Sequence, residues 1–179
     1  FHYTIRTLFN AFMPRYDSVA SLLYVDRRGA PENTQMGFDF FKKLRLLYAM
    51  VSLSPSKNSI IVSELNWPLS GTAPYAPTSE YECVDEEHYR NYMVRSYLLG
   101  LCSGVVDTIY WHQLAASGYG LIDLREGERK RDAFQAYKVM VSFLRGAYLQ
   151  EYSLGTINRA FFLKGHQGIE VFWSTQETE

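Results

Sequence analysis

The amino-acid sequence predicts an α/β fold in which strands and helices alternate, followed by a β-hairpin. Three observations support this prediction. Short continuous apolar runs are typical of buried strands, the segments after them repeat apolar residues at helical spacing, and the pattern changes after Leu149. Because strand–helix alternation is built with right-handed crossovers, we expect three parallel strands in one sheet.

The chain is expected to begin with a helix and a strand. Residues Tyr3–Met13 repeat apolar side chains at three- and four-residue steps, which predicts a short amphipathic helix. The apolar run Val19–Val25 is too short for a helix and is bounded by polar residues, so we interpret it as a buried strand. Its alternation puts Ala20, Leu22 and Tyr24 on one face.

Two helices flank the second predicted strand. The apolar stripe within Phe38–Val51 predicts a helix, and the continuous apolar run in Ser59–Glu64 predicts a parallel strand. The proline-rich stretch Asn66–Cys83 is long enough to be a functional loop. A further helix is expected between Asp85, a good N-cap, and Gly104, a common stop signal. Its apolar side would comprise Tyr89, Tyr92, Met93, Tyr97 and Leu101.

A third strand and a third full helix complete the alternating part. Val105–Trp111 is the predicted strand, and Ala133–Tyr148 is the predicted helix, with Tyr148 facing inward. The segment His112–Arg131 between them is expected to be a long loop. Its run Arg125–Arg131 mixes both signs of charge, which is typical of a solvated surface.

The end of the chain has a different pattern. Arg159–Leu163 and Ile169–Trp173 read as two strands joined by a glycine-containing turn, which predicts a hairpin. We therefore divide the chain into an α/β region, residues 1–148, and the start of a β-rich region, residues 149–179. Three parallel strands leave sheet edges bare, so we expect further strands or another chain to cover them.

Composition excludes several classes of protein. With 179 residues and 47% hydrophobic residues, the chain can form a core and is not disordered, and no apolar run approaches a membrane span. A formal net charge of −1 argues against nucleic acid as a partner. The two cysteines are too few for a disulfide framework, so the compartment stays open. The 16% of aromatic residues fits a ring-rich core, and it also fits a surface that binds sugar rings or other flat ligands; the count alone favours the core.

No cofactor or metal ion is predicted. Cys83, His88, Cys102 and His112 do not have the paired spacing of a zinc site. Gly118–Gly120 lacks the third glycine of a dinucleotide-binding fingerprint, so we interpret it as loop geometry.

The candidate site lies where the predicted strands end. In parallel α/β folds, ligands bind beyond the carboxyl ends of the strands. Tyr24, Glu64 and Trp111 hold those positions, and each is expected to share a face with the preceding alternate residues of its strand. A carboxylate after a buried strand is either partnered structurally or functional, and strand position does not separate these possibilities.

Several segments resemble the clan A glycoside hydrolases, which are retaining glycosidases with a (β/α)8 barrel. Ser63–Pro68 resembles their seventh-strand motif, and Val106–Gln113 resembles their eighth strand. Ala20–Tyr24 is similar to their sixth strand. Gly118–Asp123 and Arg131–Tyr137 resemble the loop and the last helix of such barrels. The resemblance spans about residues 15–148 and is nearest to β-xylosidase-like families. It implies the C-terminal part of a TIM barrel, about three strand–helix units.

The resemblance also implies residue roles on a carbohydrate substrate. Glu64 would be the catalytic nucleophile, Tyr24 would hydrogen-bond it, and Trp111 would be the platform under the sugar. Lesser contacts to sugar hydroxyls would come from Asn66, Trp67, His112 and Gln113.

This sequence lacks one group that the family's mechanism requires, the general acid/base. Such barrels take their general acid/base from a glutamate that follows an asparagine at the end of the fourth strand, whereas here Glu32 precedes Asn33. We therefore expect the partner to be the missing N-terminal part of the barrel or a second copy of this chain, and the isolated chain to hydrolyse glycosides poorly. The alternative is a non-catalytic carbohydrate-binding or pseudoenzyme fragment that self-associates.

Overall fold

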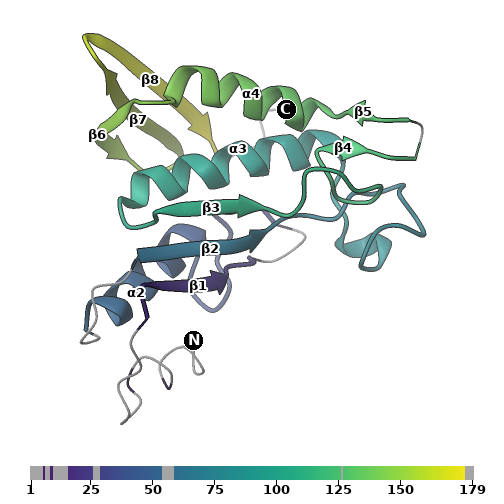
Figure 1. Ribbon diagram of the computed structural model, residues 1–179, viewed down its shortest axis with the longest axis horizontal. Helices are drawn as coiled ribbons and strands as arrows, with labels where there is room; N and C mark the ends of the chain where they lie inside the picture. Colours follow the sequence, from purple (N-terminus) through teal and green to yellow (C-terminus); the bar gives the residue numbers. More distant parts are fainter. Residues whose placement is uncertain are drawn as a thin grey trace.

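The computed structural model describes residues 6, 9, 16–25, 29–53, 59–125 and 127–175. Its centre is a parallel sheet in the order β1 (Ser18–Leu22), β2 (Ser59–Leu65), β3 (Thr108–Trp111). The three strands point the same way, so their carboxyl ends meet at one edge (Figure 1). The three predicted parallel strands are confirmed. Apart from residues 6 and 9, the predicted helix Tyr3–Met13 lies outside the described residues.

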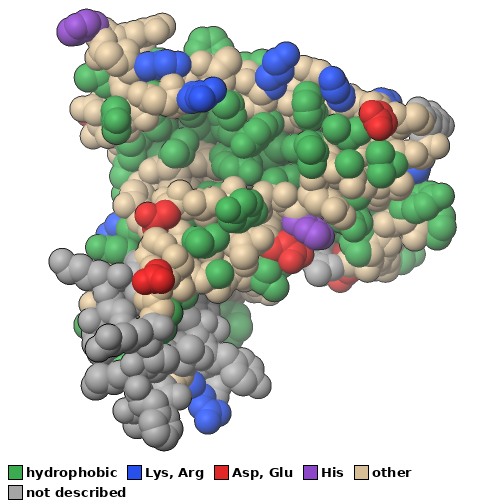
Figure 2. Space-filling view, viewed as in Figure 1, with side chains coloured by type: hydrophobic (Ala, Val, Ile, Leu, Met, Phe, Trp, Pro, Cys, Tyr) green, Lys and Arg blue, Asp and Glu red, His purple; other side chains and the backbone are tan. Residues whose placement is uncertain are grey.

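Among the described residues, three α-helices accompany this sheet: α2 (Phe40–Ser52), α3 (Glu86–Ser103) and α4 (Asp132–Leu144). The predicted ends of α3 are confirmed. The Asp85 carboxylate accepts a hydrogen bond from the backbone N–H of His88 at 2.8 Å, and Gly104 ends the helix with φ of 64°, a conformation that favours glycine. α3 and α4 pack side by side, and Figure 2 shows hydrophobic side chains gathered over them.

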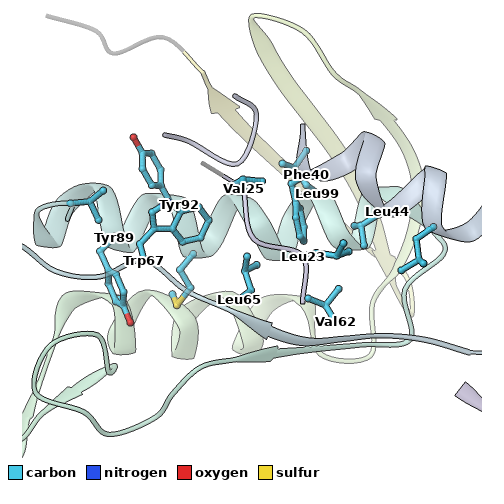
Figure 3. Packing of buried hydrophobic residues seen from close by; sticks show 14 of the residues in the cluster. Leu23, Val25, Phe40, Leu44, Val62, Leu65, Trp67, Tyr89, Tyr92 and Leu99 are labelled. Carbon is cyan, nitrogen blue, oxygen red and sulfur yellow. The ribbon is translucent and has the colours of Figure 1, made fainter. Parts of the chain in front are cut away.

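The main core lies between the sheet and the helices α2 and α3. Leu44 of α2, Val62 of β2 and Leu99 of α3 are almost fully buried there, as Figure 3 shows. The aromatic residues Tyr89, Tyr92 and Trp67 extend this core toward the carboxyl ends of the strands. The predicted inward position of Leu101 on α3 is wrong, because that side chain is 45% exposed at the far end of the helix.

A bulge interrupts the regular alternation of β2. Val62 lies opposite Ile109 but Leu65 lies opposite Trp111, so β2 has one more residue than β3 over this stretch. Ile60, Val62 and Leu65 are all buried at 1% exposure or less, whereas Glu64 is partly exposed. The expectation that Glu64 shares a face with Ile60 and Val62 is therefore wrong. The extra residue turns the Glu64 side chain away from the core.

The C-terminal part forms a three-stranded antiparallel sheet in the order β6 (Tyr148–Ser153), β7 (Ile157–Lys164), β8 (Gln167–Ser174). The predicted hairpin is β7–β8. The sequence missed β6, and the predicted inward position of Tyr148 in a helix is wrong. The helix ends at Leu144 because Gly146 takes a positive φ of 75°, and Tyr148 begins a strand with 75% of its surface exposed.

This antiparallel sheet packs on the helices. Phe162 and Ala160 of β7 are buried against Cys102 of α3. The indole N–H of Trp173 donates a hydrogen bond of 3.1 Å to Glu32, and the guanidinium of Arg95 on α3 binds both oxygens of the same carboxylate. The Glu32 carboxylate thus links the loop after β1 to α3 through a bidentate ion pair and to β8 through the Trp173 hydrogen bond.

The segment between β3 and α4 folds back on itself. It contains the short strands β4 (Ile122–Asp123) and β5 (Arg129–Lys130), and the loop before α3 contains the 3-10 turn Glu80–Glu82. The interpretation of the charged run as wholly solvated is wrong for Arg131, which is 1% exposed. None of the helices within the described ranges has both the length and the apolar character needed to cross a membrane.

Candidate functional site

A pocket of about 130 Å³ lies at the carboxyl ends of the parallel strands. Figure 1 shows why side chains can meet there: β1, β2 and β3 all end at the edge beside β4 and β5. Loop residues after each strand complete the wall. The lining comprises Tyr24, Glu64, Asn66, Trp67, Pro68, Pro77, His112 and Tyr119.

Glu64 is the acidic centre of this pocket. The hydroxyl of Tyr24 donates a hydrogen bond to its Oε1 atom, and the Nε2 atom of His112 lies 4.0 Å from the same oxygen. The carboxylate keeps a third of its surface exposed, so a ligand can reach it. Among the residues that the structure describes, Glu64 is the only carboxylate that lines the pocket.

Lys43 of α2 holds the backbone of Tyr24 in place. Its ammonium group donates hydrogen bonds of 3.0 Å to the backbone carbonyl of Tyr24 and to the side chain of Gln35. Burial lowers the pKa of Lys43, and the nearby Asp39 carboxylate partly opposes that effect. The sequence analysis missed Lys43, although it lies within the apolar stripe of α2 between Phe40 and Leu47, where a lysine needs a partner.

Trp111 lies elsewhere than expected. It does not line the pocket but packs on the core side of β3, where its indole stacks on Trp67 with ring centroids 5.9 Å apart. Its N–H donates a hydrogen bond of 2.8 Å to the hydroxyl of Tyr89. Burial raises the pKa of Tyr89, so this phenol stays neutral and can donate its own proton to the Tyr119 carbonyl.

Asn66 and Trp67 line the pocket while holding its loops. The Asn66 side chain accepts a hydrogen bond from the backbone N–H of Trp67 and donates one to the Tyr119 carbonyl, both at 2.7 Å. The indole of Trp67 donates to the Gly29 carbonyl at 3.0 Å, and this residue is only 1% exposed. These polar groups join the loops after β1, β2 and β3.

His112 and Gln113 both contact Tyr119. The His112 ring stacks on the Tyr119 ring, with centroids 5.6 Å apart and planes 14° apart. The Gln113 amide donates a hydrogen bond of 3.1 Å to the Tyr119 hydroxyl, and Gln113 does not line the pocket. Tyr119 was not among the predicted site residues. The glycines on either side of it were the available signal, because they indicate a tightly packed loop.

The described residues contain no group of three or more potential metal-ligating side chains that lie close together. The described lining of the pocket combines one carboxylate, one imidazole and several aromatic rings.

The comparisons with known proteins bear on the fold. No protein-family model matches this chain, and neither does any curated protein. Among solved structures, the chain is similar to a family 39 glycoside hydrolase from the gut symbiont Bacteroides cellulosilyticus WH2, with a TM-score of 0.77 at 15% identity. The likeness covers 96% of this chain and 36% of that one, so the chain spans about a third of that enzyme's length and has the fold of that part.

Proposed function

We propose that this chain is the C-terminal part of a retaining glycoside hydrolase with a (β/α)8 barrel, acting on β-linked saccharides with Glu64 as nucleophile. The observation that carries the proposal is the hydrogen bond from Tyr24 to Glu64 in an open pocket at the carboxyl ends of parallel strands. The fold likeness to a family 39 glycoside hydrolase, a clan A family, supports it.

The proposed chemistry uses Glu64 in the ionised form. Its carboxylate attacks the anomeric carbon, the glycosidic C–O bond breaks, and a glycosyl ester forms on Glu64. The Tyr24 hydroxyl orients the attacking carboxylate and stabilises its charge. A water molecule then attacks the same carbon, releasing the sugar and regenerating the carboxylate with net retention of configuration.

The leaving oxygen must gain a proton during the first step. Retaining enzymes supply it from a second carboxyl group about 5–5.5 Å from the nucleophile, and that group later takes a proton from the water. Glu64 is the only carboxyl group in the described pocket lining, so the described lining has no second carboxyl group for this role. We therefore propose that the acid/base residue comes from polypeptide outside the described residues, and that the isolated chain turns over glycosides poorly.

Two features of the described residues support an incomplete barrel. Within the described part, β1 and β3 each pair with only one neighbour, so the parallel sheet has two open edges. On α4, Val139 and Phe143 are each 55% exposed, and Ala133 is the buried residue of that helix. Further strand–helix units of a barrel would cover both the edges and this helix.

The other predicted contacts are revised in the proposal. His112 stays a candidate ligand contact because its ring faces the pocket 4.0 Å from Glu64. Asn66 and Trp67 act mainly by holding the loops, and Gln113 acts through Tyr119. We do not propose Trp111 as the sugar platform, because it packs against Trp67 on the core side of β3.

The test is hydrolysis of aryl β-glycosides by the full-length protein and by its Glu64→Gln variant. We expect the variant to lose at least about a thousandfold in kcat, since it removes the nucleophile but keeps the side-chain shape. Glu170→Gln, which neutralises a carboxylate on β8, is the matched control and keeps full activity. Wild-type turnover in Glu64→Gln would refute the proposal. Glycoside binding without hydrolysis by the full-length protein would favour the pseudoenzyme alternative instead.

A further inference from the structure

Among the aromatic residues of the described pocket lining, Tyr119 neither contacts Glu64 directly nor is fully buried. Tyr24 is engaged with Glu64, and Trp67 is 1% exposed with its indole N–H bonded to the Gly29 carbonyl. Tyr119 also lines the pocket, and its ring is stacked on His112, whose imidazole lies 4.0 Å from Glu64. A flat pair of rings thus stands directly beside the acidic group.

The backbone of Tyr119 is held independently of its ring. Its carbonyl accepts hydrogen bonds of 2.7 Å from both Asn66 and the Tyr89 hydroxyl. The buried guanidinium of Arg131 donates 3.0 Å hydrogen bonds to the carbonyls of the neighbouring residues Gly120 and Ser117. These bonds fix the backbone of Tyr119, while the hydrogen bond from Gln113 to its hydroxyl and the stacking on His112 position its ring.

The glycines beside Tyr119 show how closely this loop is packed. A Cβ atom on Gly118 would lie 2.4 Å from the Tyr75 carbonyl oxygen, and one on Gly120 would lie 2.2 Å from the Ala116 backbone nitrogen. Both are far below van der Waals contact with backbone atoms, which cannot move aside easily. Only glycine fits at these two places, so the loop presents Tyr119 in one arrangement.

We propose that Tyr119 is a specificity-determining residue of this site: its ring, with His112, forms the wall on which a sugar ring packs next to Glu64. The inference rests on the proposed function and deepens it. An aromatic face favours a sugar with an apolar C–H face, and the Tyr119 hydroxyl, fixed by Gln113, can bond a sugar hydroxyl. Because the ring is fixed in advance, little conformational entropy is lost on binding.

The experiment compares Tyr119→Ala, Tyr119→Leu and Tyr119→Phe in the full-length protein, with aryl β-glycosides as substrates. We expect KM to rise about tenfold in the alanine and leucine variants, because the leucine restores bulk but not the aromatic face. Phenylalanine keeps most of the affinity, and kcat changes less than KM in all three. Because the backbone carbonyl of Tyr119 makes the structural hydrogen bonds, these variants retain them.

The control is Tyr81→Ala, which removes a tyrosine that is 88% exposed in the 3-10 turn of the neighbouring loop. It should leave KM unchanged. A wild-type KM in Tyr119→Ala, or a wild-type KM in Tyr119→Leu, would overturn the inference about Tyr119. If Glu64→Gln is inactive in the same assays, the proposed function still holds. Wild-type activity in Glu64→Gln would instead remove the proposed function itself.

Discussion

Two arginine-centred clusters in this protein use the same kinds of side chain in different surroundings. Arg131 is 1% exposed and lies between Asp123, at 2.9 Å, and Glu86. Arg159 lies between Glu151 and Glu170 on the antiparallel sheet, where all three side chains are at least 40% exposed. The first cluster joins α3, β4 and the start of α4, whereas the second spans adjacent strands that the backbone ladder already holds together.

Burial decides how much each of these ion-pair clusters contributes to folding. Water screens the Arg159 cluster, so it contributes little to folding. In the Arg131 cluster, Arg131 and Asp123 are almost fully buried whereas Glu86 is 35% exposed, so the two buried groups depend on their partners. Arg131 also donates hydrogen bonds to two backbone carbonyls of the loop that carries Tyr119. The buried cluster therefore links stability to the geometry of the candidate site.

The largest expected effect is on the buried cluster. Arg131→Met should lower the free energy of unfolding by about 2–4 kcal/mol, because two buried carbonyls lose their Arg131 donor. Asp123 and Glu86 each lose one arginine partner, although Arg125 and Arg129 still pair with Asp123 and Arg129 still pairs with Glu86. Urea denaturation followed by circular dichroism measures this change. A loss under about 1 kcal/mol would mean that the cluster is as well solvated as the one around Arg159.

A smaller effect is expected in the acid range. The pKa of Asp123 lies well below its usual value, because Arg125 donates hydrogen bonds to it and Arg131 adds its charge, while burial opposes them. A depressed folded-state pKa gives stability that is present above about pH 4 and is lost as pH falls below it. Unfolding midpoints measured from pH 7 to pH 3 should fall more steeply in wild type than in Asp123→Asn. Parallel curves would contradict this prediction.

The smallest effect is expected at the exposed cluster. Arg159→Met should leave the urea midpoint unchanged within error and leave glycoside KM unchanged, because its partners stay solvated. Measured beside Arg131→Met, it replaces the same residue type by the same side chain. An equal loss of stability in both variants would remove the distinction between the two clusters.

Local patterns predicted much of the fold. The apolar runs of β1, β2 and β3 and the caps of α3 are written in neighbouring residues, so they could be found from the sequence. The strand β6 could not, since the helical spacing of apolar residues runs on past Gly146, whose positive φ ends the helix. Tertiary pairing with β7 then decides the conformation of this stretch.

The sequence predicted that Glu64, Tyr24, Asn66, Trp67 and His112 lie at one site, and all five line the pocket, but it missed Tyr119. Glu64 and Tyr24 follow apolar runs, which placed them at strand ends, and the structure brings them into contact. The bulge in β2 has no local signature, so the face of Glu64 was assigned on the wrong alternation. Tyr119 reaches the pocket through Asn66, Tyr89 and Arg131, contacts between segments that are distant in sequence.

The most direct test of Glu64 as the catalytic nucleophile is to trap the covalent glycosyl-enzyme intermediate. The full-length protein is incubated with an activated 2-deoxy-2-fluoro β-glycoside, which slows release of the sugar from a carboxylate nucleophile, and then digested and weighed by mass spectrometry. We expect one sugar on the peptide that contains Glu64, and none in Glu64→Gln. A sugar on another carboxylate, in a protein that hydrolyses the parent glycoside, would contradict it.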